Sequence, residues 1–449
     1  MGKELFGTDG IRGVAGEYPL DRRTAYAVGV ALARWVRRHG ASQRVVIGMD
    51  TRESGPWLGA CVAGGLREGG VTSHLAGVVT TPGIAYLTRT GDFVAGVMIS
   101  ASHNPYEDNG IKIFDHSGYK APDDDEHELE QEVFRLLARG GDARPDHLEI
   151  EAELDETYLA HLARNAPELR GVRIAVDCGN GAASELAPGL LGRLGAEVHA
   201  MADTPDGRNI NRNCGALHVA ALRRLVIETN SDLGVAYDGD ADRAIFVTGA
   251  GRIVDGDGVL LLCARRLLAR GGLTGGDGEP LVVATVMSNL GLEQALRESG
   301  ITMTRTPVGD KYVLEEMRRR NAALGGEQSG HVIFRELATT GDGLLTTLQV
   351  LAGMKETGCS LDELTADLEI YPQVLLNIRV KRRKPLRDLP AVQEAIHCAE
   401  AAFADSGRVL VRFSGTEPLA RVMVEGEDAS AVDHHAHLIA AAIRDSLSG

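Results

Sequence analysis

Short apolar runs, separated by longer mixed segments, recur along most of the chain. Three of them, at residues 45–50, 173–177 and 281–286, are each followed by a loop, a helix-length segment, a glycine and a second run that ends at Thr-Pro. Short apolar strands joined by helices of about ten residues predict βαβ units with largely parallel pairing. The pattern indicates three diverged copies of one α/β domain, although such units are common enough for a chance likeness to be the alternative.

The pattern changes after Tyr371-Pro372. The predicted order becomes strand, helix, strand, strand, helix, over residues 374–380, 391–404, 409–413, 420–425 and 432–446. Elements in this order are typical of a small α+β domain. We therefore predict the α/β class, with three similar mixed-sheet βαβ-type domains and a smaller C-terminal α+β domain.

Glycine-rich stretches indicate where the domains meet. One is Gly140-Gly141-Asp142, which is followed by Pro145, and another is a predicted turn at residues 255–258. A chain of 449 residues is also too long for a single core. The predicted domains are residues 1–150, 151–255, 256–370 and 371–449.

The composition of the chain limits the kinds of molecule that it is expected to bind and the cell compartment in which it is expected to lie. The 47 basic and 63 acidic residues give a net charge of −16, which argues against nucleic acid or an anionic membrane as a partner. The first thirty residues carry too many charges for a signal peptide, and no apolar run is long enough to span a membrane. The six scattered cysteines lack a C-x-x-C pair, so neither zinc nor disulfides are expected. We expect a reduced, cytoplasmic protein.

Three aspartates at alternate positions form the strongest chemical signal. Asp238, Asp240 and Asp242 follow an apolar run at 233–237, so they can lie on one side of the chain as it leaves a sheet. A calcium loop of the EF-hand type is excluded, because Arg243 stands where that loop needs its glycine. A solvated acidic turn is the alternative, but three carboxylates repel one another unless a cation joins them. The spacing favours a Mg²⁺ site.

A candidate nucleophile precedes a proline. Ser102 is followed by His103-Asn104-Pro105, whose proline prevents a helix from running through the loop. No G-x-S-x-G motif surrounds Ser102, so a hydrolase-type nucleophile is not supported, and an ordinary turn serine is the alternative. Gly110 predicts a turn, and Lys112 starts a predicted strand that returns an ammonium group to this loop. A hydroxyl, a divalent cation and Arg243 in one cleft suit phosphoryl transfer.

Two further loops offer ligands for a sugar phosphate. In the first, Glu327 and Ser329 can bind sugar hydroxyls, and His331 is a candidate acid or base near neutral pH. A capping turn between a strand and a helix is the alternative there. In the second, a guanidinium, two hydroxyls and a glycine between two strands suit a phosphate dianion, and a plain hairpin is the alternative. These residues are Arg412, Ser414, Gly415 and Thr416, with Arg421 on the next strand.

Taken together, these loops resemble those of the α-D-phosphohexomutase superfamily, and the match spans essentially the whole chain. Gln328 and the segments 308–313 and 339–343 resemble the corresponding residues of the members that act on glucosamine phosphate. Phe413 stands where the family commonly has proline, and Ala241 where it often has glycine, but neither change removes a ligand. The matching motifs are residues 6–13, 100–110, 326–331 and 412–418.

The resemblance implies four domains round a central cleft, which carry in turn a phosphoserine loop, a metal loop, a sugar loop and a phosphate-binding loop. Ser102 would be phosphorylated and would bind Mg²⁺ together with the three aspartates, with Arg243 beside the phosphate. His103, Lys112 and His331 would be the unranked candidates for proton transfer. The residues implied to bind substrate are Arg12, Glu327, Ser329, Arg412, Ser414, Gly415, Thr416 and Arg421.

The activity implied is the reversible conversion of glucosamine 6-phosphate to glucosamine 1-phosphate through a 1,6-bisphosphate, which feeds UDP-N-acetylglucosamine and cell-wall synthesis. Phosphomannomutase/phosphoglucomutase activity is the alternative. A non-catalytic sugar-phosphate sensor is less consistent with an intact serine and three aspartates. The resemblance also implies one Mg²⁺ per subunit, glucose or glucosamine 1,6-bisphosphate as primer, a homodimer, and priming of Ser102 by a kinase or by autophosphorylation.

Overall fold

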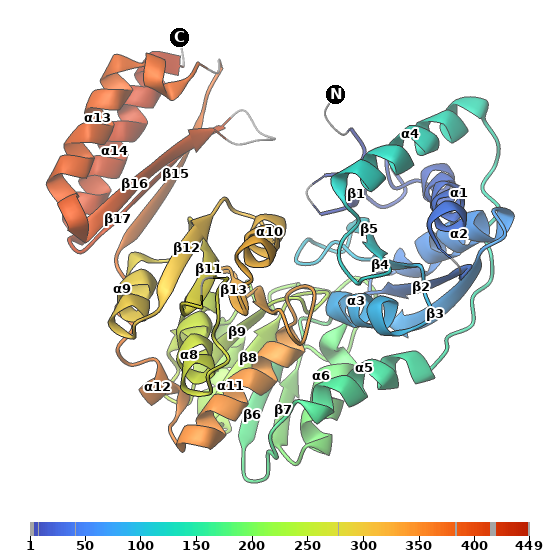
Figure 1. Cartoon of the computed structure of the whole chain (residues 1–449), viewed down its shortest axis with the longest axis horizontal. Coiled ribbons are helices and arrows are strands. Elements are labelled where there is room, and N and C mark those ends of the chain that lie inside the picture. The colour runs from blue at the N-terminus through green and yellow to red at the C-terminus, as the bar shows by residue number, and fades with distance from the viewer. Residues whose placement is uncertain are drawn as a thin grey trace. The chain divides into compact units, whose positions relative to one another are not determined.

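The structure, a computed structural model, describes residues 4–7, 9–40, 42–276, 278–381, 384–413 and 419–447 (Figure 1). The chain divides into two compact units. The first consists of Met1–Met287 and Ile301–Ala366, and the second of Ser288–Gly300 and Asp367–Gly449. Among the described residues, the structure contains no helix with the length and apolar character needed to cross a membrane.

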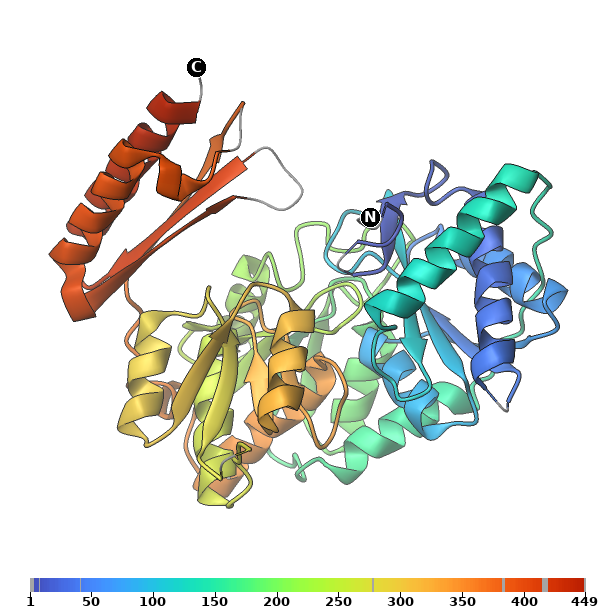
Figure 2. The same cartoon turned by 45° about the horizontal axis from the view of Figure 1, so that its top comes forward.

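The first sheet of the first unit lies between two layers of helices (Figure 2). Its order is β1-β5-β4-β2-β3, in which β2 pairs parallel with β3 and β4, while β5 is antiparallel to β4 and to β1. The helices α1, α2 and α4 cover one face, and α3 and α5 cover the other. The bounds are β1 Ile11–Val14, β2 Arg44–Met49, β3 Thr72–Val78, β4 Ala95–Ile99, β5 Asp108–Asp115, α1 Arg22–His39, α2 Gly55–Glu68, α3 Thr81–Thr90, α4 Asp123–Arg139 and α5 Glu153–Arg164.

Two more sheets follow in the same unit. The second has the order β10-β9-β8-β6-β7, and the third has the order β12-β11-β13-β14. The strands are β6 Arg173–Asp177, β7 Glu197–Met201, β8 Leu233–Tyr237, β9 Ala244–Thr248, β10 Ile253–Val254, β11 Leu281–Thr285, β12 Thr302–Thr306, β13 Leu324–Gly326 and β14 Val332–Phe334. The helices are α6 Ala183–Arg193, α7 Ala220–Glu228, α8 Gly256–Ala269, α10 Asp310–Arg320, α11 Gly343–Thr357 and α12 Leu361–Leu364.

The three sheets share one topology. In each, a central strand pairs parallel with two neighbours, and the later neighbour pairs with an antiparallel strand, which gives β3-β2-β4-β5, β7-β6-β8-β9 and β12-β11-β13-β14. The repeat predicted from the sequence is therefore confirmed. The loops predicted to carry the chemistry, residues 100–107, 238–243 and 327–331, all occupy the connection between the last parallel strand and the antiparallel strand.

Burial explains why these segments form strands and helices. Every residue of β4, β8 and β11 is buried, as expected for parallel strands covered on both faces. Helix α1 begins after Asp21, whose side chain accepts hydrogen bonds from the amides of Arg23 and Thr24. Helices α1 and α2 approach so closely that a Cβ atom on Gly29 would lie 2.1 Å from the Val62 carbonyl oxygen.

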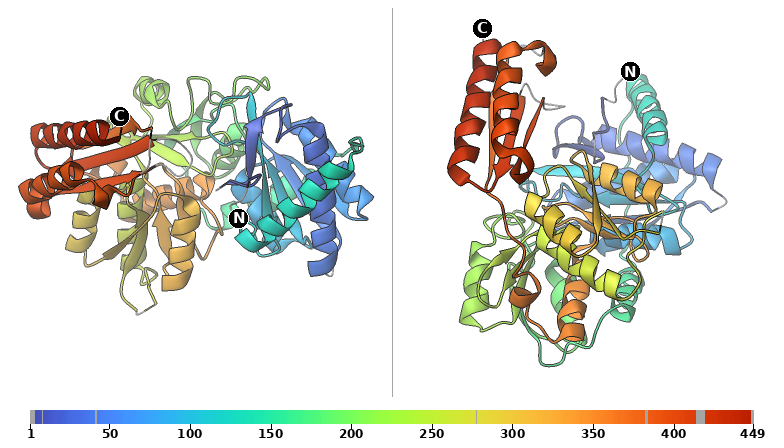
Figure 3. Two further views of the ribbon diagram at one scale, coloured as in Figure 1. Left: turned by 90° about the horizontal axis from the view of Figure 1, so that it is seen from above. Right: turned by 60° about the vertical axis from the view of Figure 1, so that its left-hand side comes forward.

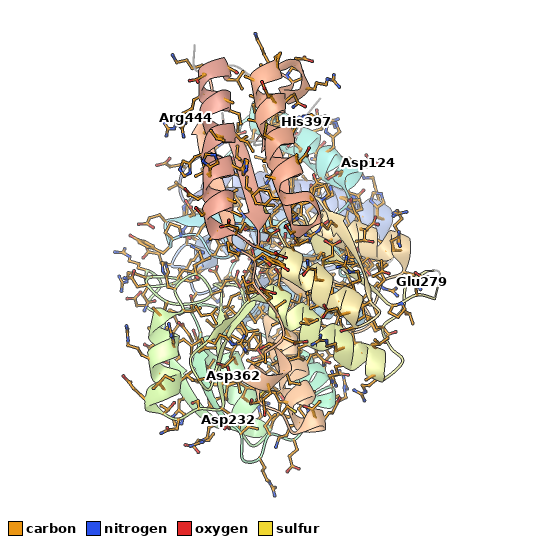
Figure 4. All side chains as sticks on the ribbon, turned by 90° about the vertical axis from the view of Figure 1, so that its left-hand side faces the viewer. Asp124, Asp232, Glu279, Asp362, His397 and Arg444 are labelled. Atoms are coloured by element: carbon orange, nitrogen blue, oxygen red, sulfur yellow. The ribbon has the colours of Figure 1, made fainter. Side chains whose placement is uncertain are left out.

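The second unit contains the predicted α+β domain. Its antiparallel sheet has the order β15-β17-β16, and the helices α13 and α14 pack side by side on one face (Figure 3, right). Figure 4 shows His397 and Arg444 projecting outward from these helices. The bounds are α9 Leu290–Glu298, β15 Gln373–Arg379, η1 Leu386–Asp388, α13 Pro390–Phe403, η2 Ala404–Ser406, β16 Gly407–Phe413, β17 Leu419–Gly426 and α14 Ala429–Leu447.

Two local predictions were wrong, and both concern glycines. Gly110 lies inside β5 opposite Arg12 and not in a turn. Glycine is needed at this position because a Cβ atom there would lie 2.5 Å from the Ser100 carbonyl oxygen. This glycine permits close approach of the backbone. Residues 255–258 do not form a turn: Asp255 caps α8 by accepting hydrogen bonds from the amides of Asp257 and Gly258, and the cap outweighs the poor helix propensity of glycine.

Candidate active site

The serine loop, residues 100–107, connects β4 to β5 and contacts the acidic loop of the second domain. The Ser102 hydroxyl donates a hydrogen bond to Asp238 Oδ2 at 2.6 Å, and its oxygen lies 3.3 Å from His103 Nδ1. Ser102 is 2% exposed and has a φ of +51°, a left-handed conformation that costs a residue with a Cβ atom roughly 1 kcal/mol. A strained turn thus holds the hydroxyl against a carboxylate.

The acidic loop, residues 238–243, connects β8 to β9. Asp238, Asp240 and Asp242 are buried, and one oxygen atom from each lies within 4.8 Å of the others. Burial, together with the charges of Asp242 and Asp240, holds the pKa of Asp238 well above its usual range. Oδ1 of Asp240 and Oδ1 of Asp242 have no hydrogen-bond partner among the described residues. A divalent cation would relieve this crowding of carboxylate oxygens.

Lys112 reaches the acidic loop from β5, where it stands opposite Met98 of β4. Its buried ammonium nitrogen lies 2.8 Å from Asp240 Oδ2 and 3.1 Å from Asp9 Oδ2. Burial would lower the pKa of Lys112, but the charges of Asp240 and Asp9 outweigh burial and raise the pKa. Lys112 is therefore a fixed positive charge beside the carboxylates. The strand returns it to the loops as the sequence predicts, but the strand begins at Asp108 and not at Lys112.

The two histidines differ in their surroundings. The buried His331 has Nδ1 at 3.5 Å from Asp242 Oδ2, and its Nε2 accepts a hydrogen bond from the Gly341 amide at 3.0 Å. Because Nε2 accepts, the proton of the neutral ring lies on Nδ1, facing the carboxylate. For His103, burial and the charge of Arg243 lower the pKa to about 4. The His103 ring is therefore neutral at pH 7.

Two arginines border these loops. Arg243 Nε lies 3.7 Å from Asp242 Oδ1. Arg12 of β1 donates a hydrogen bond to the Ala101 carbonyl oxygen at 3.0 Å and forms an ion pair with Asp9. Their side chains are 24% and 26% exposed, respectively, so a phosphorylated ligand can reach both cations.

The sugar loop, residues 327–331, connects β13 to β14, so the alternative of a turn between a strand and a helix is wrong. Glu327 Oε1 accepts a hydrogen bond at 3.0 Å from the backbone amide that precedes α10, and Ser329 is exposed. The Gly330 carbonyl oxygen accepts a hydrogen bond from the Ala244 amide at 3.1 Å. The third loop therefore packs against the end of the acidic loop, and the first unit brings all three loops together.

In the second unit, Arg412 of β16 stands directly opposite Arg421 of β17 in the antiparallel ladder. Burial and the charge of Arg421 lower the pKa of Arg412. Like charges at opposite positions of a ladder destabilise it, and an anion bound between the two arginines would relieve this repulsion. Ser414, Gly415 and Thr416 lie outside the described residues.

Sequence reasoning missed an ionic network beside Lys112. The Lys120 ammonium group pairs with Asp9 and with Asp310, the first residue of α10. Burial opposes ionisation of Asp9, but the charges of Lys112 and Lys120 hold the pKa of Asp9 well below its usual range. The available signal was that Asp9 and Asp310 stand inside two of the segments on which the family resemblance rests.

Models of the four phosphoglucomutase/phosphomannomutase domains match successive parts of the chain. Alpha/beta/alpha domains I, II and III match residues 3–139, 156–251 and 255–371, and the C-terminal domain matches residues 375–442. A protein named phosphoglucosamine mutase from Solibacter usitatus (strain Ellin6076) is 59% identical over 448 residues, which cover 100% of both chains. The chain belongs to the phosphoglucomutase/phosphomannomutase family.

Further members of this family are also similar to the chain. A protein named phosphoglucosamine mutase from Koribacter versatilis (strain Ellin345) is 50% identical, over 99% of this chain and 97% of the relative. Among solved structures, a family protein from Burkholderia thailandensis has a TM-score of 0.81 at 25% identity, over 98% of this chain and 97% of that chain. A putative phosphomannomutase from Thermus thermophilus has a TM-score of 0.76 at 24% identity, over 100% of both chains. The resemblance drawn from the loops and the four-domain α/β architecture are confirmed.

Mg²⁺ is the cation that the phosphoglucomutase/phosphomannomutase family implies, and the acidic loop fits it. A small hard cation prefers oxygen ligands and keeps open positions for phosphate oxygens. Asp238, Asp240 and Asp242 offer such oxygens, including two without a hydrogen-bond partner among the described residues. These three residues would hold the ion, and the Ser102 oxygen is hydrogen-bonded to one of them.

Proposed function

We propose that this member of the phosphoglucomutase/phosphomannomutase family interconverts glucosamine 6-phosphate and glucosamine 1-phosphate. The observation that carries the proposal is the 2.6 Å hydrogen bond from the Ser102 hydroxyl to Asp238, a member of the carboxylate triad. A hydroxyl beside a cation site is the arrangement that phosphoryl transfer needs. Relatives at 45–59% identity that are named phosphoglucosamine mutase support the amino sugar over glucose or mannose.

In the first half-reaction, the phosphoryl group moves from Ser102 Oγ to O1 of glucosamine 6-phosphate. The bond between phosphorus and Oγ breaks, a bond to O1 forms, and the O1 proton passes to a base on the enzyme. The resulting 1,6-bisphosphate turns end over end. In the second half-reaction, its 6-phosphoryl group returns to Ser102 Oγ, O6 takes up a proton, and glucosamine 1-phosphate leaves. The phosphoserine is thereby regenerated in each cycle.

The side chains divide the work of this transfer. Lys112 and Arg243 supply positive charge to the moving phosphoryl group, and Mg²⁺, when bound, neutralises charge on its oxygens. Of the three candidates for proton transfer, His103 has a neutral ring 3.3 Å from Ser102 Oγ. Both ring nitrogens of His331 already have partners, Asp242 and the Gly341 amide. His331 is therefore better suited to holding Asp242 in place than to exchanging a proton with the substrate.

The rest of the proposal concerns binding and partners. The sugar hydroxyls would bind to Glu327 and Ser329, and the phosphate that is not reacting would bind to the arginine pair of the second unit. We also propose domain boundaries near residues 150, 255 and 370, a cytoplasmic location and a homodimer. Ser102 would first be phosphorylated by glucose or glucosamine 1,6-bisphosphate, by a kinase or by autophosphorylation. Besides Glu327 and Ser329, the residues proposed to bind substrate are Arg12, Arg412, Ser414, Gly415, Thr416 and Arg421.

The test is turnover of glucosamine 6-phosphate with Mg²⁺ and a trace of hexose 1,6-bisphosphate, run beside glucose and mannose 1-phosphates. We expect a strong preference for the amino sugar. Equal or better rates on glucose or mannose phosphate would keep the mechanism and refute the substrate. A Ser102→Ala variant that turns over at the wild-type rate would refute the mechanism itself.

A further inference from the structure

A buried arginine lies beneath the serine loop. Arg52 lies between β2 and α2, and its side chain and that of Asp50 are both 0% exposed. Arg52 Nε donates a hydrogen bond to Asp50 Oδ2 at 2.9 Å, and the Arg52 amide donates to Asp50 Oδ1 at 3.0 Å. Neither residue contributes to the catalytic roles proposed above.

The two terminal nitrogens of Arg52 point at the backbone of the serine loop. Nη2 donates to the carbonyl oxygens of Ser102 and Asn104, each at 2.9 Å. Nη1 donates to the carbonyl oxygen of Asp108 at 3.0 Å and to that of Pro105. With the bond to Asp50, all five N–H donors of the guanidinium are used. Four carbonyl groups within seven residues therefore converge on one side chain.

The same ion pair also fixes the other side of Ser102. The Ser102 amide donates to Ser100 Oγ at 2.9 Å, and Ser100 Oγ donates to Asp50 Oδ2 at 2.6 Å. The N–H and the C=O of Ser102 are thus both held by the Asp50–Arg52 pair, one through Ser100 and one directly. The Asn211 side chain also donates to the carbonyl oxygens of Ser102 and Asn104, at 2.9 and 3.0 Å. Together with the Asp50–Arg52 pair, it holds a buried non-glycine residue at a φ of +51°.

We propose that the buried Asp50–Arg52 pair positions Ser102 for phosphoryl transfer. Arg52 holds the Ser102 carbonyl group directly, and Asp50 holds the Ser102 amide through Ser100; both bonds fix the left-handed turn that aims Ser102 Oγ at the acidic loop. The inference rests on the proposed function of Ser102 as phosphoacceptor. Transfer needs the oxygen in line with the phosphorus atom, and a misplacement of about 1 Å costs roughly 100-fold in rate. Lysine cannot replace Arg52, because an ammonium group has three donors and lacks the planar fork.

The test compares Arg52→Lys with the matched control Arg266→Lys. Arg266 is also well bonded, to Gln349 and Glu356, but it lies on α8 far along the chain from the serine loop. We expect Arg52→Lys to lower kcat roughly 100-fold while KM changes by less than about threefold, because the substrate-binding groups are untouched. Phosphorylation of Ser102 by glucose 1,6-bisphosphate, followed by intact mass, should slow by a similar factor. Arg266→Lys should stay within about twofold of wild type on both measures.

Thermal denaturation separates positioning from folding. A folded Arg52→Lys variant with kcat within about threefold of wild type would overturn the proposal. If Arg52 variants do not fold, Ser100→Ala decides, because it deletes only the hydroxyl between Asp50 and the Ser102 amide. We expect its Ser102 phosphorylation to slow about tenfold, and a wild-type rate would overturn the proposal. A wild-type protein that never becomes phosphorylated at Ser102 would instead refute the proposed function, and this inference with it.

Discussion

The buried side chain of Asp342 makes the stability of the first unit depend on pH in a way that can be tested. It caps α11 by accepting a hydrogen bond from the Leu345 amide at 2.9 Å, and it accepts another from the Tyr158 hydroxyl at 2.9 Å. Burial raises the pKa of Asp342 from 3.8 to about 6. Between pH 3.8 and about pH 6, Asp342 therefore still holds its proton in the folded state, whereas it has already lost this proton in the unfolded state. Stability from this group is fully present below about pH 4 and is lost as the pH rises through 6.

The size of the effect follows from the two pKa values. Between pH 4 and pH 7, a shift from 3.8 to about 6 removes roughly 2 kcal/mol from the free energy of unfolding. Asp342→Asn does not titrate, and its amide oxygen can still accept from the Leu345 amide. We therefore expect the stability of the variant relative to wild type to rise by roughly 2 kcal/mol over this pH range.

Equilibrium urea denaturation of both proteins at pH 4, 5, 6 and 7 measures this difference, because titrations common to the two proteins cancel. The Tyr158→Phe variant is a second arm. The Tyr158 hydroxyl stabilises the charged form of Asp342, so its loss should weaken the protein more at pH 7 than at pH 4. A difference between Asp342→Asn and wild type that stays constant from pH 4 to pH 7 would refute the reasoning.

Three further outcomes follow from the site. Ser102→Ala should abolish turnover and the phosphoenzyme while binding of glucosamine 6-phosphate remains measurable by calorimetry; loss of binding would contradict this. Chelation of divalent ions should stop turnover and Mg²⁺ should restore it, whereas Asp238→Asn should lose the rise in melting temperature that Mg²⁺ gives wild type. Arg412→Ala should raise KM more than about tenfold with a smaller change in kcat, since a charge-assisted phosphate contact contributes roughly 1.5–3 kcal/mol, and an unchanged KM would exclude Arg412 as a phosphate ligand.

The sequence predicted the fold well because the fold depends on local periodicity. The apolar run before Asp238 is a buried strand, and the antiparallel hairpin that contains Arg412 and Arg421 follows the predicted order. Strand order across the sheet was not predictable, because it is set by packing between segments far apart in the chain. Gly110 shows the same limit, since the carbonyl group that it must accommodate comes from another strand end.

The candidate site was predictable where residues of the right chemistry stand close together in sequence. The three aspartates could be found by their spacing, but the partners of Ser102 could not. Asp238 lies 136 residues from Ser102, and Asp310 lies 190 residues from Lys120. Arg52 gave no chemical signal at all, because its role consists of hydrogen bonds to backbone carbonyl groups, which every residue possesses.

The repeated topology explains why these loops depend on one another. Equivalent connections in three similar sheets supply a hydroxyl, three carboxylates and the loop proposed to bind the sugar, and glycines allow these loops to pack closely together. A Cβ atom on Gly239 would lie 2.4 Å from the Ser102 carbonyl oxygen, and one on Gly330 would lie 2.4 Å from the Ala244 carbonyl oxygen. The serine loop therefore packs against the acidic loop, and the acidic loop packs against the sugar loop, backbone to backbone. Because the hydroxyl, the proposed cation site and the side chains proposed to bind the sugar each belong to a different domain, the alignment that the proposed transfer needs exists only when all three domains are packed together.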